Sequence, residues 1–189
     1  MSKVLLLYGT RYGTTKEISD TIEQVIKEKG INTESYNLGE YNLKDIPPLL
    51  DYDGIVLGSG IKINRWTKAV KKFVNKRKSE LKEKQRTLGF YVCCGVAAKK
   101  SDIGKAINDY ITSKLQKLEI YPALIDAFGG CYDLTEGSPI TGFTRKIVVG
   151  IMKDEEGIES PEGKKHDYRD WEQIKDFANR FGDLLKNKV

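Results

Sequence analysis

The sequence contains no long hydrophobic run, no paired cysteines and only one histidine, and each shortage argues against a class of protein. The longest apolar run near the start, residues 4–8, is too short for a signal peptide or a membrane span. Three cysteines without paired spacing are typical of a reduced, cytoplasmic protein rather than a disulfide scaffold. A single histidine, His166, and the absence of a C-x-x-C pair argue against a zinc site.

What the sequence does contain is the composition of an ordinary folded domain. Apolar residues make up 39% of the 189 positions and charged residues 31%, with both signs present, which excludes a disordered or fibrous chain. The length is slightly more than one typical domain. We therefore expect a single domain, 1–189, with an appendage and with a core that needs no disulfide or metal.

Short apolar runs alternate with helix-sized patterns along most of the chain. Strands are predicted at residues 4–8, 32–37, 52–59, 88–94 and 123–128. Apolar residues at helical spacing predict intervening helices, one of them with the buried stripe Trp66, Val70, Phe73 and Val74, and a closing helix that begins near Trp171. Strands separated by helices imply right-handed crossovers, so we predict a doubly wound α/β fold with a five-stranded parallel sheet in the order 2-1-3-4-5.

The segment 131–168 does not follow this alternation. It lies between the fifth strand and the last helix, and its apolar residues recur at helical spacing: Ile140, Phe143, Ile147, Val148, Ile151 and Met152. We interpret it as an insertion rather than a second domain. Its helix could pack on the domain, line a hydrophobic substrate site, form a dimer interface, or touch a membrane surface through 140–152.

The loop after the first strand has the features of a phosphate-binding turn. It leads directly into a helix N-terminus, whose backbone N–H groups and partial positive charge suit a phosphate. Neither the P-loop spacing nor G-x-G-x-x-G is present, because Thr14 stands where a P-loop needs glycine. The threonines of this loop offer hydroxyl donors, its arginine offers a cation, and its glycine permits a close approach of the backbone. The candidate residues are Thr10, Arg11, Tyr12, Gly13, Thr14 and Thr15.

Two further loops follow the third and fourth strands, where ligands of such sheets bind. Their candidate residues are Ser59, Gly60, Ile61, Lys62 and Asn64 in one loop and Cys94, Gly95, Val96 and Ala97 in the other. A hydroxyl-rich phosphate loop followed by two small-residue loops resembles the flavodoxins. That resemblance implies FMN, with its phosphate in the first loop and its ring between the other two, and a backbone group near Gly58–Ile61 facing the flavin nitrogen N5.

A closer resemblance covers nearly the whole chain. The T-R-x-G-x-T run from Thr10, G-x-x-I at 58–61, the long insertion and D-W-E-Q at 170–173 resemble the menaquinone-dependent protoporphyrinogen dehydrogenase branch. This implies two-electron chemistry on a hydrophobic substrate with a quinone as acceptor. One departure concerns residues 131–143, which contain no arginine, whereas the enzyme branch is rich in arginine there and porphyrin carboxylates require cations.

Positive charge is concentrated in one segment. Residues 62–100 hold 13 Lys and Arg against 2 Asp and Glu, a net of +11 in a chain whose total is +5. The lysines of 62–86 form either a solvated helix face or a docking surface for an acidic partner, and we expect no nucleic acid because no recognition motif accompanies them. Positive charge near a flavin should stabilise its reduced, anionic form and raise its potential.

Flavin chemistry needs few protein side chains, so we nominate no catalytic residue. Tyr12, Trp66 and Tyr132 could stack on a flavin, although Trp66 fits a helix core better. Adjacent Cys93 and Cys94 are interpreted as buried apolar residues on opposite faces of a strand, and His166 as a solvated loop residue.

Three functions are therefore compatible with the sequence. The first is an FMN-binding electron carrier between cytoplasmic redox partners. The second is an FMN-dependent protoporphyrinogen dehydrogenase or quinone reductase. The third is a flavodoxin-like binding module without redox activity.

Overall fold

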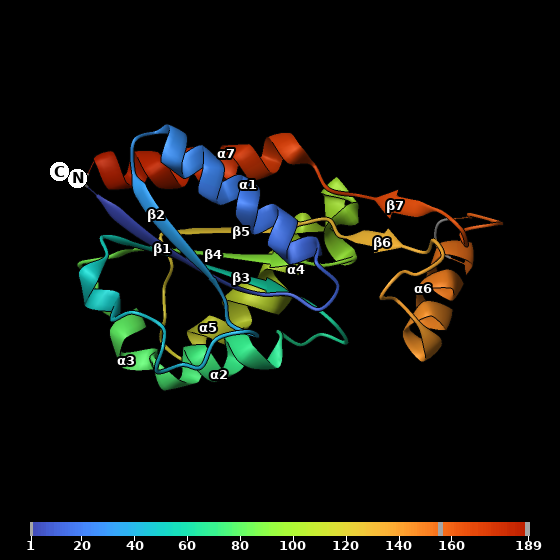
Figure 1. The fold of residues 1–189 in the computed structure, drawn as a ribbon, viewed down its shortest axis with the longest axis horizontal. Coiled ribbons are helices and arrows are strands. Elements are labelled where there is room, and N and C mark those ends of the chain that lie inside the picture. Colours follow the sequence, from blue (N-terminus) through green and yellow to red (C-terminus); the bar gives the residue numbers. More distant parts are fainter. Residues whose placement is uncertain (1, 155–156, 188–189) are drawn as a thin grey trace.

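A parallel sheet of five strands organises the chain (Figure 1). In the computed structural model, which describes residues 2–154 and 157–187, every neighbouring pair of these strands is parallel and the order is β2-β1-β3-β4-β5. The strands are β1 (Lys3–Gly9), β2 (Asn32–Asn37), β3 (Gly54–Gly60), β4 (Thr87–Cys93) and β5 (Leu124–Phe128). This order confirms the predicted doubly wound α/β fold.

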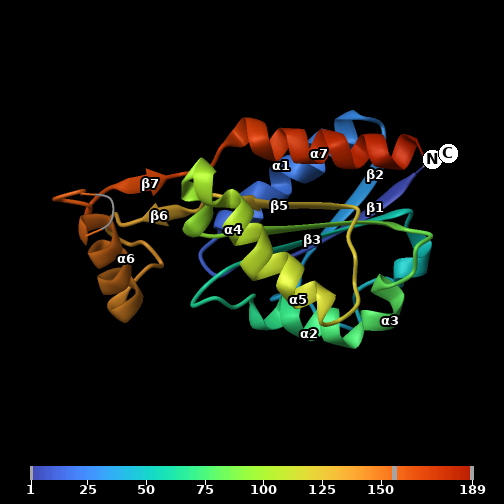
Figure 2. The same ribbon diagram turned by 180° about the vertical axis from the view of Figure 1, so that it is seen from behind.

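Helices cover both faces of the sheet, as seen from the front and from behind (Figure 2). One face carries α1 (Thr14–Glu28) and α7 (Trp171–Lys186). The other carries α2 (Lys68–Lys76), α3 (Lys78–Leu81), α4 (Ile103–Ile107) and α5 (Ser113–Gln116). A π-helical segment, η4 (Asn108–Thr112), joins α4 to α5, and short 3-10 turns are η1 (Leu49–Asp51), η2 (Val96–Ala98) and η3 (Lys100–Asp102).

The strands are buried on both sides, so alternate residues enter two separate cores. Leu5 and Leu7 pack toward α2 and η4, whereas Val4 and Leu6 pack toward α1 and α7. Cys93 and Cys94 follow the same alternation: both are buried free thiols, and each belongs to a different core. Their interpretation as small apolar residues on opposite faces is confirmed.

The predicted start of the second helix is wrong by two residues. Thr67 caps α2 by accepting a hydrogen bond from the Val70 N–H at 3.3 Å, so the helix begins at Lys68 and Trp66 precedes it. The Trp66 ring is nevertheless in the core, where its Nε1–H donates to the carbonyl of Tyr110 at 2.7 Å. The prediction that Trp66 belongs to the core is therefore correct, although Trp66 is not part of the helix from which it was predicted.

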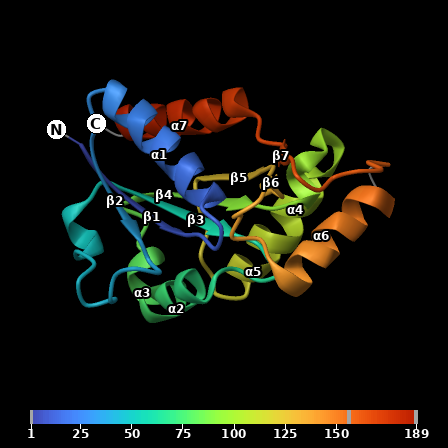
Figure 3. The same ribbon diagram turned by 45° about the vertical axis from the view of Figure 1, so that its right-hand side comes forward.

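The segment 131–168 stands beyond the carboxyl ends of the strands (Figures 1 and 3). It consists of β6 (Cys131–Asp133), α6 (Gly142–Asp154) and β7 (Lys165–Asp167), with β6 and β7 paired antiparallel. The interpretation of His166 as a solvated loop residue is wrong, because it lies half-buried in β7 and its Nε2 is 2.8 Å from the carbonyl of Pro161.

The apolar stripe of the insertion divides into two faces. Ile140, Val148 and Met152 are buried with Leu134 in a small core between α6 and the hairpin. The other members, which lie on α6, are exposed: Phe143 at 77%, Ile147 at 39% and Ile151 at 43%. Within the described residues, no helix has both the length and the apolar character needed to cross a membrane.

Candidate functional site

The loop 10–15 connects β1 to α1 and leaves the start of the helix open. Gly13 adopts a left-handed conformation (φ 89°), which glycine tolerates without strain, and its N–H donates to Oγ1 of Thr10 at 3.0 Å. Within the described residues, no side chain caps the N-terminus of α1. The first N–H groups of α1 are thus available to an anion, which fits the phosphate of FMN.

Two threonines of this loop have their side chains turned toward the protein. Thr15 is buried, and Thr14 Oγ1 donates to the carbonyl of Cys131 in the insertion at 3.3 Å. The phosphate loop therefore touches β6, which follows 117 residues later in the sequence.

Arg11 holds the loop after β3. Its guanidinium donates to the carbonyls of Gly60 at 2.7 Å, Trp66 at 2.9 Å and Arg65 at 3.3 Å. We expected this side chain to offer its charge to a phosphate. In the structure it fixes residues 60–66 relative to the phosphate loop.

The loop after β3 turns back on itself in a tight hairpin. Lys62 and Arg65 exchange backbone hydrogen bonds of 3.1 Å, and both residues between them have positive φ, 48° for Ile63 and 55° for Asn64. Such a turn suits asparagine and glycine but strains a β-branched isoleucine. Asn64 Oδ1 accepts a hydrogen bond from the Tyr110 hydroxyl at 3.0 Å, which anchors the hairpin to η4.

The other candidates of this loop are oriented differently. Ser59 is fully buried, where its Oγ accepts from the N–H of Thr67 at 3.0 Å, so its side chain positions the start of α2. Gly60 and Ile61 are half-buried, and the N–H of Ile61 donates to the carbonyl of Cys93 at 2.8 Å. These contacts place the backbone of 59–61 beside the end of β4.

The loop after β4 is built from small residues. Cys94 is buried and its N–H donates to the carbonyl of Phe128, and burial raises the pKa of its thiol to about 11. Gly95 is exposed, and a Cβ there would lie 2.4 Å from the Tyr132 hydroxyl. Val96 and Ala97 begin the turn η2. Glycine at 95 thus allows the insertion to approach this loop closely.

Three parts of the site meet at Lys62. Its Nζ donates to the Tyr12 hydroxyl at 2.9 Å and to Oγ1 of Thr144 in α6 at 2.8 Å. The hydrogen bond from Lys62 lowers the pKa of the Tyr12 phenol. One ammonium group therefore links the phosphate loop, the loop after β3 and the insertion helix.

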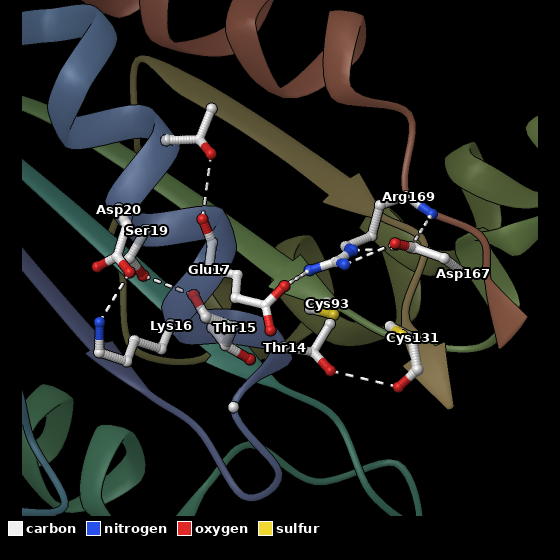
Figure 4. Close-up of polar contacts among 12 residues, drawn as sticks. Thr14, Thr15, Lys16, Glu17, Ser19, Asp20, Cys93, Cys131, Asp167 and Arg169 are labelled. Carbon is white, nitrogen blue, oxygen red and sulfur yellow. Dashed lines mark hydrogen bonds and ion pairs between the residues drawn. The ribbon is translucent and has the colours of Figure 1, made fainter. Parts of the chain in front are cut away.

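A second link ties the insertion to α1 (Figure 4). Arg169 is almost fully buried, with 3% of its side chain exposed, and contacts Glu17 of α1 at 2.5 Å and Asp167 of β7 at 2.6 Å. Burial lowers the pKa of the guanidinium, but the hydrogen bonds to these two carboxylates raise it by more. Arg169 also lies over the ring of Trp171, 4.4 Å from its centroid.

Sequence reasoning did not identify Thr144, Arg169 or Glu17. Thr144 meets Lys62 and Arg169 meets Glu17 only because the insertion folds back toward the loops at the ends of the strands. The position of Arg169, directly before the D-W-E-Q run, was the available signal for one of them. Within the candidate set, hydrogen bonds join Arg11 to Gly60 and Tyr12 to Lys62, whereas Thr14 bonds Cys131 of β6.

The comparisons with known proteins agree with this geometry. The sequence model of the flavodoxin domain family matches residues 5–161. The protoporphyrinogen IX dehydrogenase (quinone) of Escherichia coli strain K12 is 26% identical over 182 residues, which is 96% of each chain. The enzyme of the same name from Leishmania major is 27% identical over 184 residues, which is 96% of this chain and 75% of the other.

Solved structures show the same fold. Flavodoxin 1 from Bacillus cereus has a TM-score of 0.57 and 20% identity, and the match covers 95% of this chain and 97% of the other. The Flv1 flavodiiron core from Synechocystis has a TM-score of 0.63 and 13% identity, and the present chain spans 37% of its length. The comparisons confirm the predicted flavodoxin-like fold and, with it, FMN as the cofactor.

Proposed function

Because the chain belongs to the flavodoxin domain family, we propose that it is an FMN-dependent oxidoreductase that uses a quinone as electron acceptor. When bound, FMN would supply the two-electron redox chemistry that couples oxidation of a reduced substrate to reduction of the quinone to the quinol. The protein's part is to bind the cofactor, orient it and provide a surface for the acceptor.

The cofactor would be held by the three loops already described. The open start of α1 together with Thr10 and Gly13 would take the phosphate. The backbone of the loop after β3, fixed by Arg11, and the small residues after β4 would flank the ring. The ammonium of Lys62 would add positive charge beside it, which favours the reduced form.

The observation that carries the proposal is the exposed apolar face of α6. Phe143, Ile147 and Ile151 follow one another at every fourth residue and are all exposed. Thr144, adjacent to Phe143, bonds Lys62 of the loop after β3, so this face starts at the edge of the proposed flavin site. A quinone with an apolar body would be bound there by burial of its ring and side chain.

The two relatives support the quinone rather than a particular donor. Both are named as quinone-dependent enzymes, and the Escherichia coli enzyme matches this chain over 96% of both lengths. Their other substrate, protoporphyrinogen IX, needs cations for its carboxylates. Residues 131–143 contain no arginine, and Arg145 is engaged with the carbonyl of Leu134 at 2.5 Å and with that of Thr135.

The test is anaerobic re-oxidation of the reduced, FMN-loaded protein by menadione in a stopped-flow spectrophotometer. We expect fast re-oxidation by menadione and slow re-oxidation by an oxidised ferredoxin. Fast exchange with ferredoxin and none with menadione would instead assign the chain the role of an electron carrier.

A paired variant separates the apolar face from the flavin itself. Phe143→Ser with Ile147→Ser should slow re-oxidation by menadione on the order of tenfold, because it removes apolar contact area. Re-oxidation by ferricyanide, a small soluble anion, should not change. The matched control is Leu50→Ser with Tyr121→Ser, which alters exposed apolar residues outside the insertion and should leave both rates as they were.

A further inference from the structure

A basic groove lies on the α2 side of the sheet, next to the loop after β3. It encloses about 990 Å³, a size typical of small-molecule sites. Seven cationic side chains line it: Arg11, whose guanidinium is held by three carbonyls of residues 60–66, and a further six, Lys62, Arg65, Lys68, Lys71, Lys114 and Lys117. Its lining also includes apolar groups, among them Trp66, Ile63 and Leu118, but no Asp or Glu.

These six cations are not neutralised within the protein. None of them forms an ion pair with a carboxylate in residues 2–154 or 157–187. Asp109, whose pKa is lowered chiefly by its hydrogen bond to Lys105 and also by the charge of Lys114, is paired with Lys105 at 2.6 Å. Like charges gathered in a hollow create a strong local field for anions.

Part of the remaining basic segment is neutralised. Arg77 pairs with Glu80, Lys82 with Glu119 and Arg86 with Glu83, whereas Lys72, Lys76, Lys78 and Lys84 form no ion pair within the described residues and do not line the groove. Lys114 and Lys117 join the groove from the far end of the η4 and α5 helical run. Cations from two segments, 40 or more positions apart in the sequence, therefore gather in one groove. A helix face that is only solvated would not need cations from a second segment.

The start of α2 shows that this arrangement costs stability. Lys68 and Lys71 lie in the first turn of α2, which contains no acidic residue. Cations at a helix N-terminus oppose the helix dipole, and lysines three residues apart repel each other. An anion in the groove would relieve both effects, since it would meet the positive end of the helix and the lysines together.

The walls of the groove are held in place by buried contacts. Trp66 bonds the carbonyl of Tyr110 at 2.7 Å, and the Tyr110 hydroxyl bonds Asn64 at 3.0 Å. These two bonds join the hairpin after β3 to η4, so the lysines of α2 and α5 are carried by fixed elements. A preformed site loses less entropy on binding than one that must assemble.

We propose that this groove binds a small organic polyanion, with at least two phosphate or carboxylate groups on an apolar body. The cations on opposite walls would hold the anionic groups, and Trp66, Ile63 and Leu118 would contact the apolar part. A hollow of this size with charge on its walls favours a small ligand over a flat protein surface. The groove borders the proposed flavin site, since Arg11 and Lys62 line both, but its other cations belong to α2 and to the η4 and α5 run, and the proposal does not depend on the proposed redox function.

The test uses two probes, inorganic tripolyphosphate and benzene-1,2,4,5-tetracarboxylate, added to the full chain saturated with FMN. Isothermal titration calorimetry at low ionic strength should show one site for at least one probe, with affinity that falls as salt rises. The probe that binds more tightly tells whether phosphate or carboxylate is recognised. The same titration without FMN makes a failure of flavin binding distinguishable from a failure of the groove.

Three double variants make the assignment specific. K68E/K71E and K114E/K117E should each weaken probe binding by at least about tenfold, because they reverse charge on the two walls. K72E/K76E changes two exposed lysines of the same helix that do not line the groove, and should stay within about twofold of the unaltered protein. Thermal unfolding verifies that all three variants fold.

Two results would overturn the proposal. One is that neither probe binds at low ionic strength, whatever the state of the flavin. The other is that K72E/K76E weakens binding as much as the groove variants, which would mean diffuse attraction to the whole basic face. In the first case, binding of a poly-glutamate peptide would assign the groove to an acidic protein.

Discussion

Arg169 and Glu17, separated by 152 residues in the sequence, form an ion pair of 2.5 Å between the insertion and α1. Only 3% of the Arg169 side chain is exposed, and its other nitrogens bond both carboxylate oxygens of Asp167. Together with the bond from Thr14 to Cys131, this pair fixes β6 and β7 to the start of the helix that would bind the phosphate (Figure 4). The insertion is therefore part of the site rather than an independent appendage.

The first prediction concerns this anchor. Arg169→Met should lower the free energy of unfolding by about 1–3 kcal/mol, because it leaves Glu17 and Asp167 without their common partner. Limited proteolysis should then cut within 131–168 sooner than in the unaltered protein. Arg180→Met is the matched control, since it removes an exposed pair with Asp176 on the same helix and should cost less than about 0.5 kcal/mol. Equal proteolysis of the two variants would contradict the anchoring role.

The second prediction concerns pH. The hydrogen bond from Arg169 lowers the pKa of Asp167 below its ordinary value of 3.8. A lowered pKa in the folded state gives stability that is present above the ordinary pKa and is lost as the pH falls through the folded value. Asp167→Asn should therefore melt at a lower temperature than the unaltered protein at pH 7, and this difference should shrink below pH 3.8. A difference that is constant from pH 7 to pH 3 would refute the coupling.

The third prediction separates two roles of Arg11. The Arg11 guanidinium holds three carbonyls of residues 60–66. Arg11→Ala should therefore weaken the binding of FMN and the binding of riboflavin by a similar factor, on the order of tenfold. Thr10→Val, in the phosphate loop, should weaken the binding of FMN and leave the binding of riboflavin unchanged, because riboflavin has no phosphate. Fluorescence titration measures both ligands. If Arg11→Ala affects FMN alone, its charge acts on the phosphate as the sequence suggested.

The fourth prediction concerns the hairpin 62–65. Ile63 has φ 48° and is 72% exposed, so it combines a strained backbone with an unburied apolar side chain. Asn favours this conformation, and Ile63→Asn should raise the free energy of unfolding by about 1 kcal/mol. Leu50→Asn removes an exposed apolar side chain, 68% exposed, without a change in strain, and should stay within about 0.5 kcal/mol. Chemical denaturation of both variants decides whether strain is stored at this turn.

The sheet could be predicted because its strands are continuous apolar runs. Residues 4–8 and 88–94 admit few alternatives once helices separate them, and right-handed crossovers leave a few common orders, of which 2-1-3-4-5 is one. The turn between β1 and α1 could be predicted because it is contiguous in sequence, and its binding of a phosphate stays a prediction. The start of a helix was harder to predict. The spacing of the apolar residues does not show that Trp66 lies outside the helix that Thr67 caps.

What could not be predicted depends on contacts between distant segments. The guanidinium of Arg11 turns to the carbonyls of the loop after β3, and Lys114 joins the groove of Lys68, because the folded chain brings them together. Neither contact leaves a pattern in one sequence. The exposure of Phe143 could not be predicted either. The apolar stripe of the insertion predicts an apolar helix face, but it does not show which of its residues pack against the hairpin and which face solvent.

The measurement that tests the account most directly is a titration of the purified chain with FMN, followed by flavin fluorescence and the visible absorbance spectrum. We predict one site, quenched flavin fluorescence and a dissociation constant tighter than about 10 micromolar. No quenching, or no change in the flavin spectrum at millimolar protein, would contradict the assignment of the three loops at the carboxyl ends of β1, β3 and β4 as an FMN site.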